Sequence, residues 1–95
     1  MDDMKYRKIE MEIAELQDVI RELRPVMRGS VTLMGRRNKQ PYFSVGIKRK
    51  TKVIYLGDKR AEKAREYVAN YRRLLQAAED MTILNMELLK MESPE

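Results

Sequence analysis

The residues best suited to binding chemistry are basic side chains concentrated in one segment of the chain. Residues 25 to 57 contain eight Lys or Arg and no Asp or Glu, although the whole chain has a net charge of only +5. Concentrated positive charge opposes folding by self-repulsion and is most simply explained by an anionic partner. A solvated charged surface is the plainer alternative for any single cluster. The size of this segregation favours a binding role.

Tyrosines and hydroxyl side chains are interleaved with these cations, which is typical of surfaces that hold phosphates and stack on bases or sugars. The candidate nucleic-acid contacts are Arg36, Arg37, Lys39, Tyr42, Lys48, Arg49, Lys50, Lys52 and Tyr55. The tyrosines have a plainer explanation as well, because exposed sheet faces favour Tyr through strand propensity alone. Gly46, within this segment, predicts a β-bulge or the close approach of another backbone.

The composition argues against most other chemistry. The chain has no His and no Cys, so it lacks the commonest general base, disulfides and the usual zinc ligands. No constellation of nucleophile, base and orienting group is visible. We therefore expect no enzymatic activity, no catalytic residues, no metal and no cofactor. The apolar runs are too short for a signal peptide or a membrane span, which predicts a cytoplasmic protein.

The elements that position the cations begin with a helical arm over residues 1–27. Its apolar residues repeat at alternating spacings of three and four, which predicts an amphipathic helix. This stripe consists of Tyr6, Ile9, Ile13, Leu16, Ile20, Leu23 and Met27. Pro25 biases Arg24 away from the helical conformation, so the helix should end near Leu23. The stripe suits either packing within the chain or an intermolecular coiled coil.

Residues 29–57 predict a basic three-stranded antiparallel sheet. The candidate strands are residues 31–36, 42–48 and 51–56, joined by turns at 37–41 and at Arg49–Lys50. The alternation of side chains assigns a buried face to Val31, Leu33, Phe43, Val45, Ile47, Ile54 and Leu56. The open face then presents Arg36, Tyr42, Lys48 and Tyr55, together with the hydroxyls of Thr32, Ser44 and Thr51.

The remaining residues predict a long helix over 58–92, with Asp58 as its N-cap and no Gly or Pro before Pro94. Its first apolar stripe consists of Ala61, Ala64, Val68, Tyr71, Leu75 and Ala78. A second stripe, shifted relative to the first, consists of Met81, Leu84, Leu88 and Met91. The shift fits either one helix with a stutter or a break near residues 79–80, and we favour one helix.

These elements predict an α+β fold and a single domain over residues 1–95. The order is helix, three-stranded antiparallel sheet and long helix, with the helical arms packed as an antiparallel pair or coiled coil. A domain of this size buries a modest fraction of its surface, which favours a homo-oligomer. The expected oligomerisation residues are Ile9, Ile13, Leu16, Ile20, Leu23, Leu84 and Leu88.

Two family resemblances accompany this pattern. The three short strands and following helix, over about 40 residues from Gly29, look like the N-terminal DNA-binding domains of tyrosine recombinases and the plant AP2 domain. The shared features are Gly29-Ser30, the basic hairpins, the turn at Gly57 and the Ala-rich start of the helix. The resemblance implies that the sheet enters the major groove and that its outward side chains contact bases and phosphates.

The second resemblance covers residues 23–91 and is to an uncharacterised family of small microbial proteins associated with mobile elements. The similar segments are Gly29-Ser30, Pro41-Tyr42-Phe43, Lys50-Thr51, Tyr55, Tyr67, Asn70-Tyr71-Arg72 and residues 84–89. Many members carry a Cys/His-rich insert that resembles a metal knuckle. This sequence has Arg36-Arg37-Asn38-Lys39-Gln40 there instead, so no metal role carries over.

The sequence thus predicts a nucleic-acid-binding protein, with double-stranded DNA favoured over RNA. In this hypothesis the basic sheet supplies the contacts and the helical arms supply oligomerisation. The alternative is a small protein-interaction module or inhibitor from a mobile element or phage, which binds a protein or nucleoprotein partner.

Overall fold

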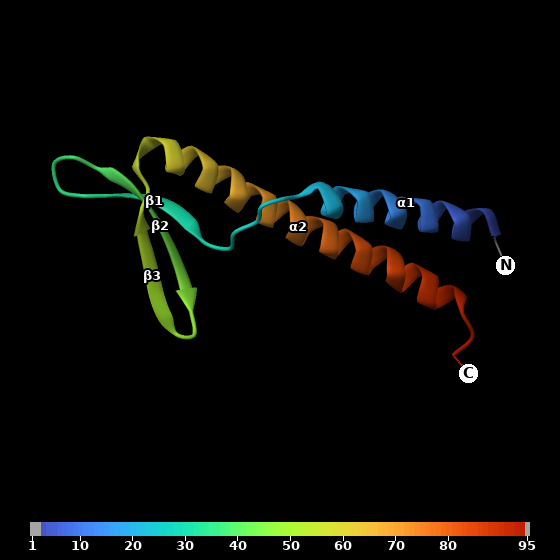
Figure 1. Cartoon of the computed structure of the whole chain (residues 1–95). Coiled ribbons are helices and arrows are strands. Elements are labelled where there is room, and N and C mark those ends of the chain that lie inside the picture. Colours follow the sequence, from blue (N-terminus) through green and yellow to red (C-terminus); the bar gives the residue numbers. More distant parts are fainter. Residues whose placement is uncertain (1–2, 95) are drawn as a thin grey trace. The chain divides into compact units, whose positions relative to one another are not determined.

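The computed structural model describes residues 3–94 and confirms the predicted α+β class and element order (Figure 1). Helix α1 spans Asp3–Glu22, strands β1, β2 and β3 span Ser30–Met34, Gln40–Ile47 and Lys50–Tyr55, and helix α2 spans Gly57–Met91. Helix α2 is continuous, so there is no break near residues 79–80. Neither helix, within the described residues, has the length and apolar content of a membrane span.

Where the sequence predicts one domain, the elements group into two compact units. One, the helical unit, contains α1 and the part of α2 from Arg73 onward. The other, the sheet unit, contains residues 24–72, which include all three strands and the first part of α2.

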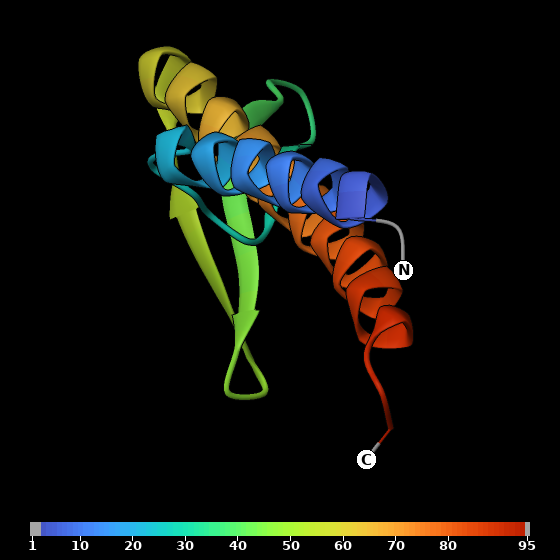
Figure 2. The same ribbon diagram turned by 90° about the vertical axis from the view of Figure 1, so that its right-hand side faces the viewer.

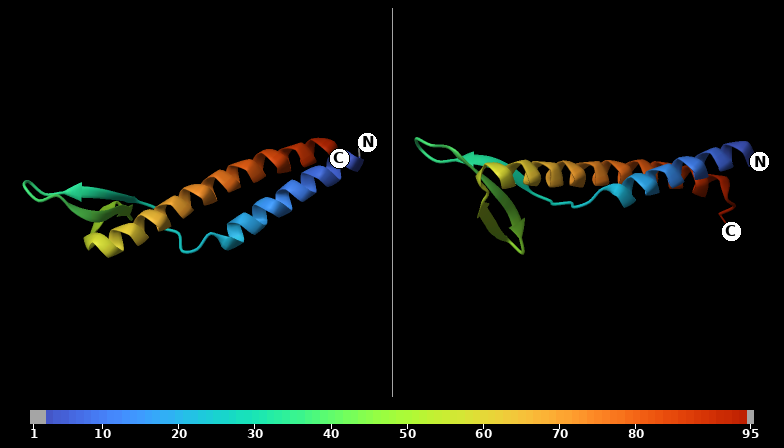
Figure 3. Two further views of the ribbon diagram at one scale, coloured as in Figure 1. Left: turned by 90° about the horizontal axis from the view of Figure 1, so that it is seen from above. Right: turned by 45° about the horizontal axis from the view of Figure 1, so that its top comes forward.

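Within the helical unit, α1 lies alongside the last part of α2 and runs in the opposite direction (Figures 1 and 3). Ile9 is buried, and the other apolar stripe residues of α1 are partly buried, whereas most of the remaining α1 side chains are exposed. A single amphipathic helix cannot bury Ile9 by itself, so α2 supplies the cover. The structure therefore uses the stripe for packing within the chain.

In the helical unit, the inner apolar residues of α2 lie one position earlier in the sequence than expected. Leu75 and Ala78, expected to continue the inner stripe, are exposed, whereas Leu74 is half-buried and Ala77 is buried. The buried stripe shifts around the helix between Tyr71 and Leu74. These two residues are three positions apart, whereas the alternating spacing of three and four in the first part of α2 would place the next stripe residue four positions after Tyr71. This shift coincides with the boundary between the two units.

In the sheet unit the strands are antiparallel in the order β1-β2-β3, and Phe43 lies opposite both Val31 and Ile54. The buried cluster consists of Phe43, Leu56, Ala61, Ala64 and Val68. The two alanines let the helix backbone approach the Phe43 ring closely. The division of the sheet into two faces is confirmed, but Leu33, Ile47 and Ile54 are exposed rather than buried. Leu33 and Ile47 lie beyond the part of the sheet that α2 covers, whereas Ile54 pairs with Phe43 but lies on the edge strand β3.

The segment that precedes β1 is tied to α2 by two hydrogen bonds. The Met27 amide donates to the Tyr67 carbonyl at 3.0 Å, and Asn70 Nδ2 donates to the Pro25 carbonyl at 3.0 Å. Met27, expected as the last residue of the α1 stripe, therefore lies outside α1 and packs against the Phe43 cluster.

Replacing Asn70 by Ala is expected to lower the free energy of unfolding by about 1–3 kcal/mol, because it leaves the Pro25 carbonyl without its donor. Asn70 is only 6 % exposed, so water cannot easily replace the lost bond. Urea unfolding followed by circular dichroism measures the change. An Asn70→Ala variant as stable as the parent would show that this hydrogen bond does not stabilise the sheet unit.

Candidate nucleic-acid interface

The cations among the predicted contact residues separate into two groups at opposite ends of β2. The tip cluster surrounds the β2–β3 turn and contains Lys48, Arg49, Lys50 and Lys52. The loop cluster lies on the β1–β2 connection, residues 35–39, and contains Arg36, Arg37 and Lys39. The two clusters are separated by the length of β2. This length is about 23 Å, because each residue of a strand adds about 3.3 Å. Figure 2 shows the β2–β3 ribbon extending from the start of α2 toward the tip.

The β2–β3 turn is formed by Lys48 and Arg49, one residue earlier than expected. Their φ values are 51° and 67°, and the flanking residues Ile47 and Lys50 pair directly. Two-residue turns of this kind favour Asn-Gly, because both residues must adopt positive φ. The left-handed conformation costs other residues roughly 1–2 kcal/mol each. Lys48 and Arg49 therefore adopt a backbone conformation that is unfavourable for their residue types. Local backbone strain of this kind is concentrated at functional sites.

Arg28 joins the tip cluster, although sequence reasoning did not select it. Its Nη2 donates to the Gly46 carbonyl at 2.7 Å. The β1–β2 register pairs Ser30 with Ser44, so continuing it backwards places residue 28 beside residue 46. That register was the signal that could have identified Arg28. With Arg28 the tip cluster contains five cations.

Gly46 does not form the expected bulge. It pairs with Thr51 in an unbroken β2–β3 register. A Cβ atom added at Gly46 would meet no other atom within 4 Å. The strand therefore continues straight into the tip, with open space beside this residue.

Carboxylates of the described residues do not neutralise the positive charge of either cluster. Among residues 3–94, no carboxylate lies within 4 Å of a cation of the tip or loop cluster. The ion pairs Asp18–Arg21 and Glu87–Lys90 both lie in the helical unit. The clusters therefore present their full charge to an incoming anion.

The open face of the sheet is less cationic than predicted. Strand β1 ends at Met34, and Gly35 turns the chain at a φ of 135°, so Arg36 lies in the loop and not on the sheet. Lys48 likewise lies in the turn. Lys50 and Lys52 lie opposite Ile47 and Val45, on the other face. Between its ends the open face carries Thr32, Tyr42, Ser44, Thr51, Val53 and Tyr55.

The two candidate tyrosines contact each other on this face. The rings of Tyr42 and Tyr55 lie 5.3 Å apart between centroids, with 66° between their planes. The Tyr55 hydroxyl donates to Gln40 Oε1 at 3.3 Å. The edge-to-face contact holds the rings at an angle, so they do not offer two parallel stacking surfaces. Tyr55, 47 % exposed, is the more accessible of the pair.

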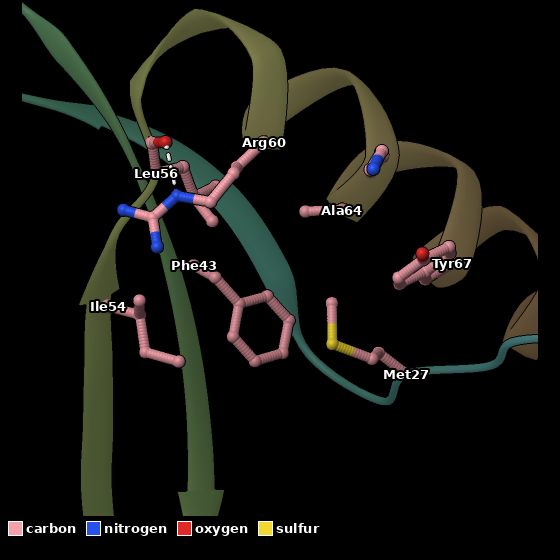
Figure 4. Close-up of a pocket in the computed structure, with 8 residues that line it drawn as sticks. Met27, Phe43, Ile54, Leu56, Arg60, Ala64 and Tyr67 are labelled. Atoms are coloured by element: carbon pink, nitrogen blue, oxygen red, sulfur yellow. Dashed lines mark hydrogen bonds between the residues drawn. The ribbon is translucent and has the colours of Figure 1, made fainter.

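An apolar groove of about 320 Å³ opens on the opposite face of the sheet unit, between β3 and the start of α2 (Figure 4). Its walls are Met27, Phe43, Ile54, Leu56, Ala64 and Tyr67, with Arg60 and Lys63 also lining it. Arg60 Nε donates to the Leu56 carbonyl at 2.8 Å, and Arg60 Nη2 donates to the Tyr55 carbonyl at 2.6 Å. Arg60 thereby holds the end of β3 against the first turns of α2.

Comparisons with known proteins assign no role to these features. No protein-family model, curated protein or solved structure matches the chain. The resemblances to the recombinase and AP2 domains and to the mobile-element family therefore remain predictions from the sequence.

Proposed function

We propose that the protein binds nucleic acid, with duplex DNA as the preferred form, through the tip and loop clusters of the sheet unit. The tip cluster carries this proposal. It contains five cations that no carboxylate of residues 3–94 approaches within ion-pair distance, and two of them occupy a turn conformation that is unfavourable for Lys and Arg. Such an arrangement opposes folding stability, and an anionic ligand gives a reason for its presence.

The dimensions of the sheet suit a duplex. A two-stranded ribbon fits the major groove, which is about 12 Å wide. The separation of the two clusters, about 23 Å, corresponds to roughly seven base-pair steps at 3.4 Å each. The tip and the loop then reach phosphates at two separate positions. The hydroxyls of Thr32, Ser44 and Thr51 lie between them and supply neutral donors. A cytoplasmic location and an origin in a phage or another mobile element accord with this role.

The salt dependence of binding tests the proposal directly. If four to six phosphates are neutralised, log K for duplex DNA should fall against log[salt] with a slope of about −4 to −5, at roughly −0.9 per phosphate. Electrophoretic shifts with duplex DNA, single-stranded DNA and RNA at several salt concentrations measure the slope and the preference. Binding that ignores salt, or no binding at about 50 mM salt, would contradict the proposal.

The apolar groove favours a second candidate function, which is binding of a protein partner. Its apolar walls and the Lys63 ammonium group suit an apolar side chain flanked by acidic residues. Recovery of a single protein at fixed stoichiometry after nuclease treatment would favour this function over DNA binding.

A further inference from the structure

Helix α2 in the helical unit carries two apolar stripes. The inner stripe, which is buried or half-buried, consists of Leu74, Ala77, Met81, Leu84, Leu88 and Met91. The outer stripe, whose members are all exposed, consists of Leu75, Ala78, Thr82, Met86 and Leu89. At about 100° per residue the centres of the two stripes lie roughly 130° apart around the helix, and together they cover about 220° of its surface. An amphipathic helix faces a single core with a stripe of about 100°, so one neighbouring helix does not cover both stripes.

The large apolar side chains of the outer stripe are more than half exposed, with Leu75 at 53 %, Met86 at 52 % and Leu89 at 67 %. A continuous exposed apolar patch of this kind marks an interaction surface. Within the described helical unit, Ile9 and Ala77 are the buried residues, so the two helices form little core between them.

The spacing of the outer stripe is symmetric about Thr82. Leu75 and Leu89 lie seven residues before and after it, and Ala78 and Met86 lie four residues before and after it. Because of this symmetry, the outer stripes of two copies match each other when their α2 helices run antiparallel and cross at Thr82. In that crossing Leu75 meets Leu89 of the second copy, and Ala78 meets Met86 of the second copy. Two-fold dimers require this kind of self-complementary surface.

We infer that a second copy of this chain covers the outer stripe, with the two α2 helices antiparallel and crossing at Thr82. The two helical units then form a four-helix arrangement, in which each α2 packs against its own α1 and against α2 of the second copy. In this arrangement the residues expected from the sequence to mediate oligomerisation pack between α1 and α2 of one chain, and the outer stripe of α2 mediates oligomerisation instead. This inference does not depend on DNA binding.

Sedimentation equilibrium of the full chain tests the inference. The parent is expected to have twice the 11.3 kDa mass of one chain. Leu75→Glu combined with Met86→Glu should give the monomer mass, with the helical circular dichroism retained. Leu33→Glu is the matched control, because Leu33 is 57 % exposed but lies in the sheet unit, and it should remain dimeric. A monomeric parent at every soluble concentration, or a double variant that remains dimeric, would overturn the inference.

Cysteine cross-linking tests the antiparallel orientation, and the absence of native Cys makes the result unambiguous. Thr82→Cys should give a covalent dimer on oxidation, because the two copies of residue 82 meet on the two-fold axis. Leu75→Cys alone should not cross-link, whereas Leu75→Cys together with Leu89→Cys should. Efficient cross-linking of Leu75→Cys alone would overturn the antiparallel arrangement.

Discussion

Replacing Lys48 by Asn and Arg49 by Gly is expected to weaken duplex DNA binding by roughly 100-fold while it stabilises the fold. Two charge-assisted phosphate contacts at about 1.5 kcal/mol each total about 3 kcal/mol, or roughly two powers of ten in affinity. Asn-Gly is the favoured sequence for a turn in which both residues have positive φ. Relief of the unfavourable conformation at two residues, less the extra chain entropy that Gly loses on folding, should raise the free energy of unfolding by about 1–3 kcal/mol. Fluorescence anisotropy at low salt and urea unfolding measure the two effects.

The expected loss of affinity and gain of stability distinguish a binding role of the turn from a structural one. A variant that binds DNA more weakly but is more stable has not lost affinity by unfolding. The matched control is Arg7→Gln with Lys8→Gln, which removes the same charge from exposed positions on α1. The control should lose little affinity. If both double variants lose affinity equally, net charge and not the tip cluster determines binding, and the site assignment fails.

The order of elements and the two faces of the sheet were predictable because they depend on periodicity. The spacing of three and four in residues 6–23 identified α1, and its end near Leu23 followed from Pro25. The alternation around Phe43 identified the side of β2 that meets the helix. Patterns of this kind extend over many residues, so a single misplaced side chain does not change the result.

The details of the site were less predictable because they depend on single residues. The β2–β3 turn carries neither Asn nor Gly, so no turn signature marked Lys48 and Arg49 as its two residues, and the expected turn was one residue late. Arg28 lies outside the strands, and only the register reveals that it reaches the Gly46 carbonyl. Propensity and periodicity do not specify register, which the turn and the packed face determine together.

The extent of burial also depends on tertiary structure. Ile47 and Ile54 face the same side as Phe43, but both are exposed, because Ile47 lies at the far end of β2 and Ile54, which pairs with Phe43, lies on the edge strand β3. The sequence specifies the side to which a strand residue points, whereas the position of the covering helix decides whether that side is buried. For the same reason the apolar groove beside Ile54 was not predictable from the sequence.

Replacing Gly29 by Ala is expected to destabilise the sheet unit by at least about 3 kcal/mol, through backbone strain combined with overpacking. Gly29 has a φ of 147°, and an added Cβ would lie 2.6 Å from Phe43 Cζ and 2.7 Å from the Ser44 carbonyl oxygen. Neither neighbour can move easily, because Phe43 is buried and the Ser44 oxygen belongs to the backbone of β2. Urea unfolding followed by tyrosine fluorescence reports mainly on the sheet unit, which contains four of the five tyrosines.

Gly46→Ala is the matched control for this prediction, because it makes the same substitution in the same unit. Its added Cβ meets no other atom within 4 Å, and its φ lies outside the left-handed region. The control should be neutral or stabilise by about 0.4–1 kcal/mol, since Ala restricts the unfolded chain more than Gly does. Equal unfolding free energies for the two variants would show that the close contact between Gly29 and Phe43 does not hold the sheet unit together.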